Sequence, residues 1–186
     1  MNEIALVFDN ETTGLTRHFK AGINRQPRII EFAGVLVQNG EIIDQMEFIC
    51  NPGIVIEEII TKITGLTNED LKDKPPFSAF VDQLAEFCGR ASVSIAHNHT
   101  FDRNMLIYDL QRLDKDLSHI NFPTLNVCTV EETQPKYGRP MKLSELYEIN
   151  VGPYSQKHRA LDDVRLLHEV CVQEGIYHYL MRGVQQ

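Results

Sequence analysis

The stretch IALVFDNETTGL at residues 4–15 carries the strongest structural signal in this sequence. Its apolar residues run without interruption from Ile4 to Phe8 and end at an acid, which is typical of a buried strand that leaves the core. Side chains alternate along a strand, so Asp9 and Glu11 should project to the same side. Two neighbouring carboxylates repel each other, and their burial is costly unless a cation such as Mg²⁺ or Mn²⁺ neutralises them. Taken alone, Asp-x-Glu fits a strand that leaves through a solvated polar turn better than it fits a metal site.

Further strands are predicted after this first one. Residues 29–37 and 41–50 are strand-like and are joined by Asn39-Gly40, the favoured two-residue hairpin turn. The polar residues 16–28, which precede this hairpin, are predicted to form a loop. Two shorter strands are expected at residues 92–96 and 125–128.

Helical spacing of apolar residues predicts amphipathic helices near residues 77–87, 101–113 and 160–171. The stretch TNED at residues 67–70 resembles a capping box at the start of a further short helix. Residues 135–140 contain Pro, Gly, Lys and Arg and are predicted to form an exposed basic loop. Strands in a hairpin, followed by helices that alternate with strands, indicate an α/β fold with a mixed central sheet.

The composition is that of an ordinary globular protein. Hydrophobic residues make up 42% and charged residues 24% of the 186 residues, and we expect residues 1–186 to form one domain. The sequence shows neither an apolar run of roughly 20 residues nor a signal peptide, so we expect no membrane association and a cytoplasmic location. The four cysteines are scattered without a Cys-x-x-Cys pair, which argues against a structural zinc site and a disulfide framework.

The net charge of −8 by itself argues against nucleic-acid binding, because phosphate contacts favour Lys and Arg. Two considerations weaken this objection. Electrostatic steering depends on local charge, and a carboxylate pocket that holds divalent cations is less negative when loaded. The charge therefore leaves the function open.

A second stretch with an acid, AHNHTFD at residues 96–102, lies where a strand gives way to a helix. Asn98 or Thr100 could cap that helix, which puts Asp102 in its first turn. The helix dipole favours an acid there, so the plainer alternative for Asp102, taken alone, is that it only stabilises the helix start. The two histidines of the stretch lack a third nitrogen or sulfur ligand at typical spacing, so zinc is not expected.

A third acidic stretch, HRALDD at residues 158–163, lies near the C-terminus. Asp163 falls on the helix that also carries the apolar Ala160 and Val164, and His158 lies at or before the start of that helix. The plainer alternative for His158 is a solvated surface histidine, because a helix N-terminus opposes its protonated form.

The three stretches together resemble the DEDD exonuclease superfamily in its histidine-bearing branch, which includes the proofreading epsilon subunit of DNA polymerase III and RNase T. The blocks Asp-x-Glu-Thr-Thr-Gly, Asn-x-x-Phe-Asp and His-x-Ala-x-x-Asp occur in the order of that family. Residues 28–34 and 63–67 also look like its connecting elements. The resemblance implies a ribonuclease-H-like fold, with helices packed around a central mixed sheet.

The resemblance also implies a role for each matching residue. The ligands of two divalent metal ions, Mg²⁺ or Mn²⁺, would be Asp9, Glu11, Asp102 and Asp163. His158 would act as general base, and the neighbouring Asp162 is not given a ligand role because adjacent helical side chains point about 100° apart. The terminal-nucleotide pocket would be lined by Thr12, Thr13, Gly14 and Leu15, and Asn98 and Phe101 would support Asp102.

The implied activity is 3′→5′ exonuclease cleavage of nucleic acid with a free 3′ end, which releases nucleoside 5′-monophosphates. We favour single-stranded DNA; RNA ends and a catalytically inactive nucleic-acid-binding module are the alternatives. The loop from Thr16 to Pro27 is longer than is common in the family, so it is a candidate substrate contact. It carries Arg17, His18, Lys20 and Arg25. The family suggests a DNA polymerase partner, although the sequence ends soon after the last predicted helix, without the long tail that the epsilon subunit uses.

Overall fold

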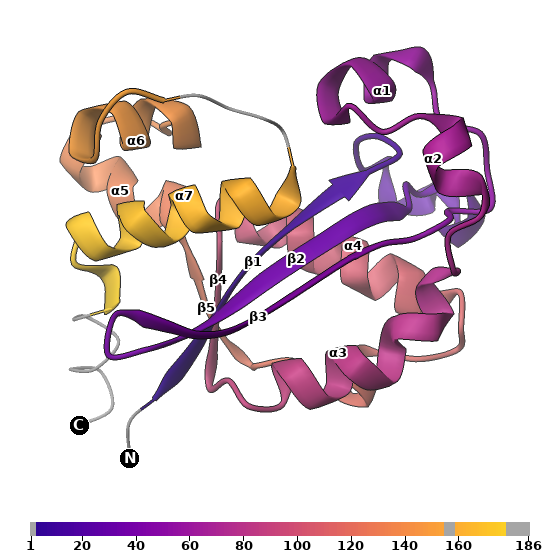
Figure 1. Ribbon diagram of the computed structural model, residues 1–186, viewed down its shortest axis with the longest axis horizontal. Helices are drawn as coiled ribbons and strands as arrows, with labels where there is room; N and C mark the ends of the chain where they lie inside the picture. The colour runs from indigo at the N-terminus through magenta and orange to yellow at the C-terminus, as the bar shows by residue number, and fades with distance from the viewer. Residues whose placement is uncertain (1–2, 155–158, 178–186) are drawn as a thin grey trace.

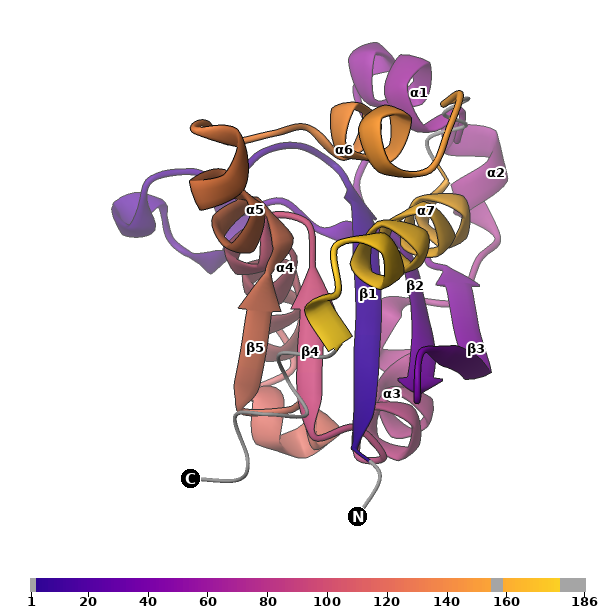
Figure 2. The same cartoon turned by 90° about the vertical axis from the view of Figure 1, so that its left-hand side faces the viewer.

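The structure is a computed structural model that describes residues 3–154 and 159–177. A five-stranded mixed sheet in the order β3-β2-β1-β4-β5 forms its centre, seen face-on in Figure 2. The two pairs β1–β2 and β2–β3 are antiparallel, and the pairs β1–β4 and β4–β5 are parallel. The strands are β1 (Ile4–Thr12), β2 (Ile29–Gln38), β3 (Glu41–Ile49), β4 (Val93–Ala96) and β5 (Leu125–Cys128).

Helices cover both faces of this sheet. Figure 1 shows α6 and α7 on one face and α3 and α4 on the other, with α1 and α2 beyond the end of β1. The helices are α1 (Glu58–Thr64), α2 (Asn68–Lys72), α3 (Val81–Cys88), α4 (His99–Gln111), α5 (Thr129–Tyr137), α6 (Leu143–Asn150) and α7 (Ala160–Gln173). Short 3₁₀ helices lie at Phe19–Ala21, Ile23–Arg25, Phe77–Phe80 and Leu117–Ile120. None of the helices in the described part of the chain combines the length and apolar character that a membrane crossing requires.

Strand alternation divides the core of β1 between two helical layers. Leu6 and Phe8 join the apolar cluster that contains residues of α3 and α4. Ala5 and Val7 join the cluster that contains the buried face of α7. Because β1 is buried on both faces, its apolar run is continuous rather than alternating. The same alternation directs Asp9 and Glu11 toward α7, and the residue between them toward α4.

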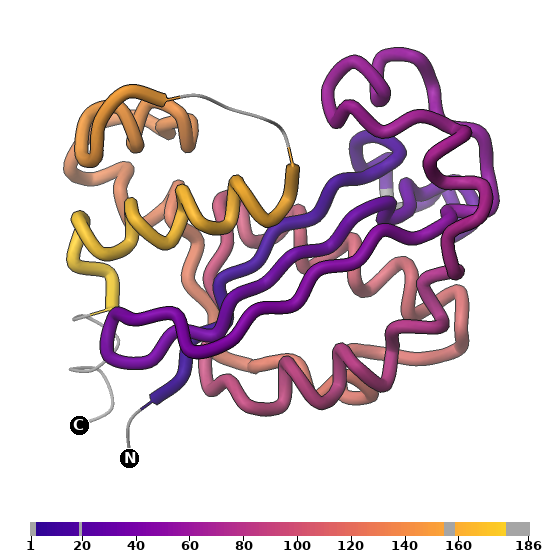
Figure 3. Tube along the Cα trace, viewed as in Figure 1, coloured from indigo at the N-terminus to yellow at the C-terminus, as the bar shows by residue number. Residues whose placement is uncertain are grey.

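Several local predictions are confirmed. The β2–β3 hairpin turns at Asn39 and Gly40, whose φ angles are 55° and 82°, and lies far from α1 in Figure 3. Thr67 and Asp70 form the predicted capping box of α2, with the Asp70 amide donating to the Thr67 hydroxyl at 3.2 Å. The prediction of an α/β fold with a mixed sheet is therefore confirmed, and so are the predicted hairpin turn and capping box.

Other local predictions were wrong or incomplete. Residues 135–140 are not wholly a loop, because α5 continues through Pro135 to Tyr137. The proline removes one helical donor, and Gly138 ends the helix by donating its N–H to the Gln134 carbonyl at 2.8 Å. The helices α1 and α6 were not predicted, since each is short and keeps large apolar side chains exposed, such as Ile59 and Ile149.

Candidate active site

Three carboxylates converge where β1 leaves the sheet beside the first turn of α7. Each of Asp9, Glu11 and Asp163 offers one oxygen, and these oxygens lie within 4.8 Å of one another. Asp9 and Glu11 share the face of β1 on which Val7 packs against the α7 cluster. Asp163 is 8% exposed, and its helix buries Ala160 and Val164 in the same cluster. The packing of α7 on β1 therefore brings together acids that are distant in sequence.

The electrostatics of this cluster are unfavourable without a cation. Burial, followed by the negative charges of Asp163 and Glu31, raises the pKa of Asp9 to about 7. Burial and the neighbouring Asp9 and Asp163 raise the pKa of Glu11 to about 9. A divalent cation would replace the lost solvation and remove the repulsion, and hard carboxylate oxygens suit Mg²⁺ or Mn²⁺. The three carboxylates thus fit the metal role expected from the sequence.

Asp102 is held against β1 by hydrogen bonds from Asn10, the residue between Asp9 and Glu11. Asp102 lies in the first turn of α4 and is 2% exposed. The Asn10 backbone N–H donates to Asp102 Oδ1 at 3.1 Å, and Asn10 Nδ2 donates to the same oxygen at 3.3 Å and to the Asp102 carbonyl at 3.1 Å. Burial and the charge of Asp9 raise the pKa of Asp102 well above its usual range. Asp102 is thus electrostatically linked to Asp9, although it is not among the three carboxylates that meet within 4.8 Å.

The end of β1 and the residues directly after it are held by local hydrogen bonds. Thr12 is buried, and its hydroxyl donates to the Gly14 carbonyl at 2.8 Å. Thr13 is tied to the start of β2, because its hydroxyl accepts from the Arg28 N–H at 3.0 Å and its N–H donates to the Arg28 carbonyl at 2.9 Å. Gly14 has a φ of 152°, and the Leu15 side chain is 81% exposed. A large apolar side chain is therefore presented to solvent just beyond the end of β1.

The remaining residues of the second stretch have distinct positions. Asn98 occupies the N-cap position of α4 in a left-handed conformation with a φ of 67°, and Phe101 is partly buried against the α3 and α4 side of the core. His97 Nδ1 lies 2.9 Å from the Thr129 hydroxyl. His99 is buried, with Nε2 2.9 Å from the Ser94 hydroxyl. The two histidines therefore contact different hydroxyls.

His158 lies outside the described residues, so its position is not described. Of the two adjacent acids in α7, Asp163 joins the cluster with Asp9 and Glu11, whereas Asp162 is not part of that group among the described residues. This difference follows from helix geometry, since the face of α7 that is buried against β1 contains Asp163 together with Val164 and Leu167.

Sequence reasoning missed three residues beside this cluster. Glu31, on β2, is 1% exposed, lies opposite Glu11 in the β1–β2 ladder and forms an ion pair with Arg159 at 2.7 Å. Tyr154 has a buried hydroxyl, and burial together with the charges of Asp163 and Asp9 raises the pKa of that hydroxyl. Glu31 had a signal in the sequence, because an acid inside the apolar run at residues 29–37 needs a buried partner.

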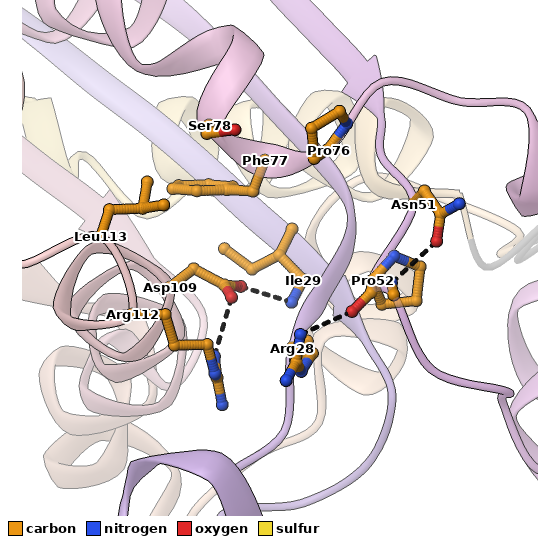
Figure 4. A pocket seen from close by; sticks show the side chains of 11 residues that line it. Arg28, Ile29, Asn51, Pro52, Pro76, Phe77, Ser78, Asp109, Arg112 and Leu113 are labelled. Atoms are coloured by element: carbon orange, nitrogen blue, oxygen red, sulfur yellow. Dashed lines mark hydrogen bonds and ion pairs between the residues drawn. The ribbon is translucent and has the colours of Figure 1, made fainter.

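A second group of buried charges braces the loop between β1 and β2. Figure 4 shows Asp109 of α4 between Ile29 and Arg112, and Arg28 bonded to Pro52. Asp109 accepts from the Ile29 N–H at 2.7 Å and pairs with Arg112 at 2.7 Å. Arg112 Nη2 also donates to the carbonyls of Ile23, Gln26 and Pro27 at 2.7–3.1 Å. The loop is therefore anchored to α4 by its backbone.

Comparison with known proteins agrees with this geometry. The sequence model of the exonuclease family matches residues 6–171. The DNA polymerase III PolC-type protein of Staphylococcus aureus is 34% identical over 160 residues, which are 85% of this chain and 10% of that protein. The corresponding protein of Caldanaerobacter subterraneus is 29% identical over 167 residues, 90% of this chain and 11% of that protein. The chain thus spans about a tenth of the length of these relatives.

A solved structure confirms the fold. The nuclease domain of 3′hExo, a DEDDh family member bound to rAMP, aligns with a TM-score of 0.75 and 18% identity over 94% of each chain. This likeness confirms the ribonuclease-H-like arrangement expected from the sequence. The sequence model that matches residues 6–171 shows that the chain belongs to the exonuclease family.

Proposed function

We propose that this chain is a divalent-metal-dependent 3′→5′ exonuclease that removes nucleoside 5′-monophosphates from single-stranded DNA ends. The observation that carries this proposal is the convergence of Asp9, Glu11 and Asp163 within 4.8 Å. Burial and mutual repulsion raise the pKa of both Asp9 and Glu11, which is expected of a site that holds cations. Exonucleases of this family generally use divalent metal ions, so the family match also supports metal binding at this site.

The proposed metal ligands are Asp9, Glu11, Asp102 and Asp163. Two bound Mg²⁺ or Mn²⁺ ions would supply charge stabilisation for the scissile phosphate and a more acidic water. Asn10 holds Oδ1 of Asp102 by two hydrogen bonds and thereby orients this carboxylate. We propose that a ring nitrogen of His158 accepts the proton of the attacking water, because an imidazole with a pKa near 6.5 can do so at neutral pH.

We infer that the turn after β1 receives the terminal nucleotide. Thr12 and Thr13 are held by the hydrogen bonds to Gly14 and Arg28, so their backbone is ordered before a nucleotide arrives. The Leu15 side chain, 81% exposed, would pack on a base, which buries apolar surface from both. Asn98 and Phe101 would support Asp102 from the start of α4.

The loop at residues 16–28 is proposed to contact the phosphate backbone. Residues 12–30 contain no acid, and they carry Arg17, Lys20, Arg25 and Arg28. Arg17 and Arg25 are exposed, while Gln26 accepts from the Arg17 N–H at 2.9 Å and holds the two sides of the loop together. A positive, braced loop next to the carboxylates would offset the net charge of −8 where the substrate binds.

DNA is proposed as the substrate because the relatives identified by sequence are DNA polymerases of the PolC type. A DNA polymerase partner is proposed on the same ground. RNA is the competing substrate, since the 2′-hydroxyl distinguishes the two and its contacts depend on the terminal-nucleotide pocket.

The test is the product ladder from matched 5′-labelled DNA and RNA oligonucleotides with Mg²⁺ or Mn²⁺. We expect stepwise shortening from the 3′ end that requires metal, with DNA degraded faster. Faster shortening of RNA would contradict the substrate assignment. Metal-independent cleavage would contradict the metal-dependent mechanism. No cleavage of either substrate would contradict the enzymatic proposal and favour a nucleic-acid-binding module.

A further inference from the structure

An ion pair between two distant residues joins β2 to the start of α7. The Glu31 carboxylate accepts from Arg159 Nη2 at 2.7 Å and from Arg159 Nε at 3.0 and 3.1 Å, which is a bidentate arrangement. Glu31 is 1% exposed, so this carboxylate has left water and depends on protein partners. The pair spans 128 residues in sequence and closes the gap between the sheet and the helix that carries Asp163.

The same carboxylate also caps α7. Within the described residues, the N-cap residue Arg159 makes no side-chain capping hydrogen bond to this helix. Glu31 Oε2 instead accepts from the Ala160 N–H at 3.3 Å, one of the amides that a helix start leaves without an internal partner. A negative charge is also favourable at that end of the helix dipole. Strand β2 therefore supplies the cap that α7 lacks, one helical turn before Asp163.

The position of Glu31 ties this cap to the carboxylate cluster. Glu31 is paired directly with Glu11 in the antiparallel ladder, and it shares the α7-facing side of β2 with Ala33 and Val35. Arg159 thus places a positive charge beside acids that otherwise repel one another. A purely stabilising ion pair could lie anywhere, whereas this one ties the helix that carries Asp163 to β2, the strand paired with the one that carries Asp9 and Glu11.

We propose that Glu31 and Arg159 are a positioning pair, which holds the first turn of α7 so that Asp163 meets Asp9 and Glu11 in one metal site. This inference rests on the proposed function, which assigns metal binding to that site. Neither residue is proposed as a metal ligand, because Glu31 is already occupied by Arg159 and the Ala160 N–H.

The Mn²⁺ affinity of the Arg159→Gln variant distinguishes a positioning role of Arg159 from a purely electrostatic effect of its charge. Loss of a positive charge near the cluster should, by electrostatics alone, strengthen cation binding. Positioning makes the opposite prediction, and loss of an outer partner of a metal ligand typically weakens binding roughly 10–100-fold. Mn²⁺ binding is measured by calorimetry at a temperature where circular dichroism shows every variant folded. Unchanged or tighter binding by Arg159→Gln would overturn the proposal.

Two further variants and a matched control complete the design. Arg139→Gln removes another bidentate Arg–Glu pair, that of Arg139 and Glu145, and should leave Mn²⁺ affinity unchanged. The double variant Glu31→Gln/Arg159→Gln should bind Mn²⁺ no more weakly than the worse single variant, because the two act as a unit. If Glu31→Gln does not fold, Arg159→Lys retains the charge without the bidentate fork and should still weaken binding. Full affinity in Arg159→Lys would also overturn the proposal.

Hydrogen exchange tests the pair without metal or turnover. In Glu31→Gln and Arg159→Gln, the amides of residues 160–163 should exchange faster, while the Val170 amide near the other end of α7 should not change. Unaltered exchange at residues 160–163 would contradict the inference. A wild-type chain that binds Mn²⁺ but degrades no oligonucleotide would refute the proposed function and leave the positioning pair standing.

Discussion

The cluster at the end of β1 and the Asp109–Arg112 pair at the end of α4 both bury acids, but the cost of burial is offset differently in the two regions. Asp109 accepts from the Ile29 N–H and pairs with Arg112, each at 2.7 Å, and these partners offset the rise in its pKa that burial causes. Asp9 and Glu11 instead face further acids, which add to the effect of burial. Burial therefore does not by itself distinguish a structural acid from a metal ligand; the charges that face the acid do.

The largest difference between the two regions is expected in catalysis. Asp163→Asn should lower turnover at least about a thousandfold, because a lost metal ligand removes several kcal/mol of transition-state stabilisation. Asp162→Asn, the adjacent acid in the same helix turn, should retain most activity. Initial rates on a 5′-labelled DNA oligonucleotide measure both. An active Asp163→Asn with an inactive Asp162→Asn would mean that the fourth ligand is misplaced.

The free energy of unfolding, in contrast to turnover, should depend strongly on the Asp109–Arg112 pair. Asp109→Ala leaves Arg112 buried without its carboxylate and should lower the free energy of unfolding by about 3–5 kcal/mol. Asp44→Ala removes the partner of Arg90 in an exposed pair and should lower the free energy of unfolding far less, because solvent screens that pair. Urea unfolding of both variants tests this. Equal losses would show that the Asp109 pair has no special structural role.

Without bound metal, the free energy of unfolding should depend on pH, because the clustered carboxylates repel one another when they are ionised. The pKa of Asp9 rises from 3.8 to about 7 and that of Glu11 from 4.5 to about 9, so the folded chain retains protons that the unfolded chain releases. Protonated Asp9 and Glu11 therefore stabilise the folded state. This contribution is fully present below the unfolded pKa values and is lost as the pH rises through the folded values of about 7 and about 9.

Glu11→Gln cannot ionise, so in EDTA its Tm should exceed that of wild type at pH 8 by more than at pH 5. A difference of a few degrees is expected, since about 1 kcal/mol shifts the Tm of a chain of this size by roughly 2–4 °C. Differential scanning calorimetry at both pH values measures the change. A Tm for Glu11→Gln below that of wild type at pH 8 would contradict the expected repulsion between the carboxylates.

The smallest expected effect concerns the loop that Arg112 braces. If Arg25 contacts a phosphate, Arg25→Ala should reduce the slope of log affinity against log salt by about 0.7 for single-stranded DNA. Arg90 lies just before β4, at the opposite end of the sheet from Asp9, so Arg90→Ala serves as the control. Fluorescence anisotropy in Ca²⁺ measures binding without requiring turnover. The same slope in wild type and Arg25→Ala would exclude this contact.

The sequence predicted what local pattern controls. The continuous apolar run of β1, the Asn39-Gly40 turn and the period of α7 identified the central sheet and the helix that packs on it. Strand and helix periodicity also indicated which side Asp9, Glu11 and Asp163 would face. The three blocks of the family supplied the connection between them, since no local pattern could show that α7 crosses β1.

Long-range partners were not predictable in the same way. Asn10 lies between two expected ligands, yet its bond to Asp102 depends on how α4 packs against β1. The pairing of Glu31 with Arg159 joins residues 128 positions apart. Proline misled the prediction at residues 135–140, because a short helix can accept one missing donor near its end.

The position of Mn²⁺ in crystals grown with that ion tests the metal site most directly. Anomalous scattering identifies Mn²⁺ without reference to activity or substrate. We predict a peak within ligand distance, about 2.0–2.3 Å, of carboxylate oxygens from Asp9, Glu11 and Asp163. Saturating Mn²⁺ that occupies other surface acids and leaves these three carboxylates without a peak would contradict the assignment.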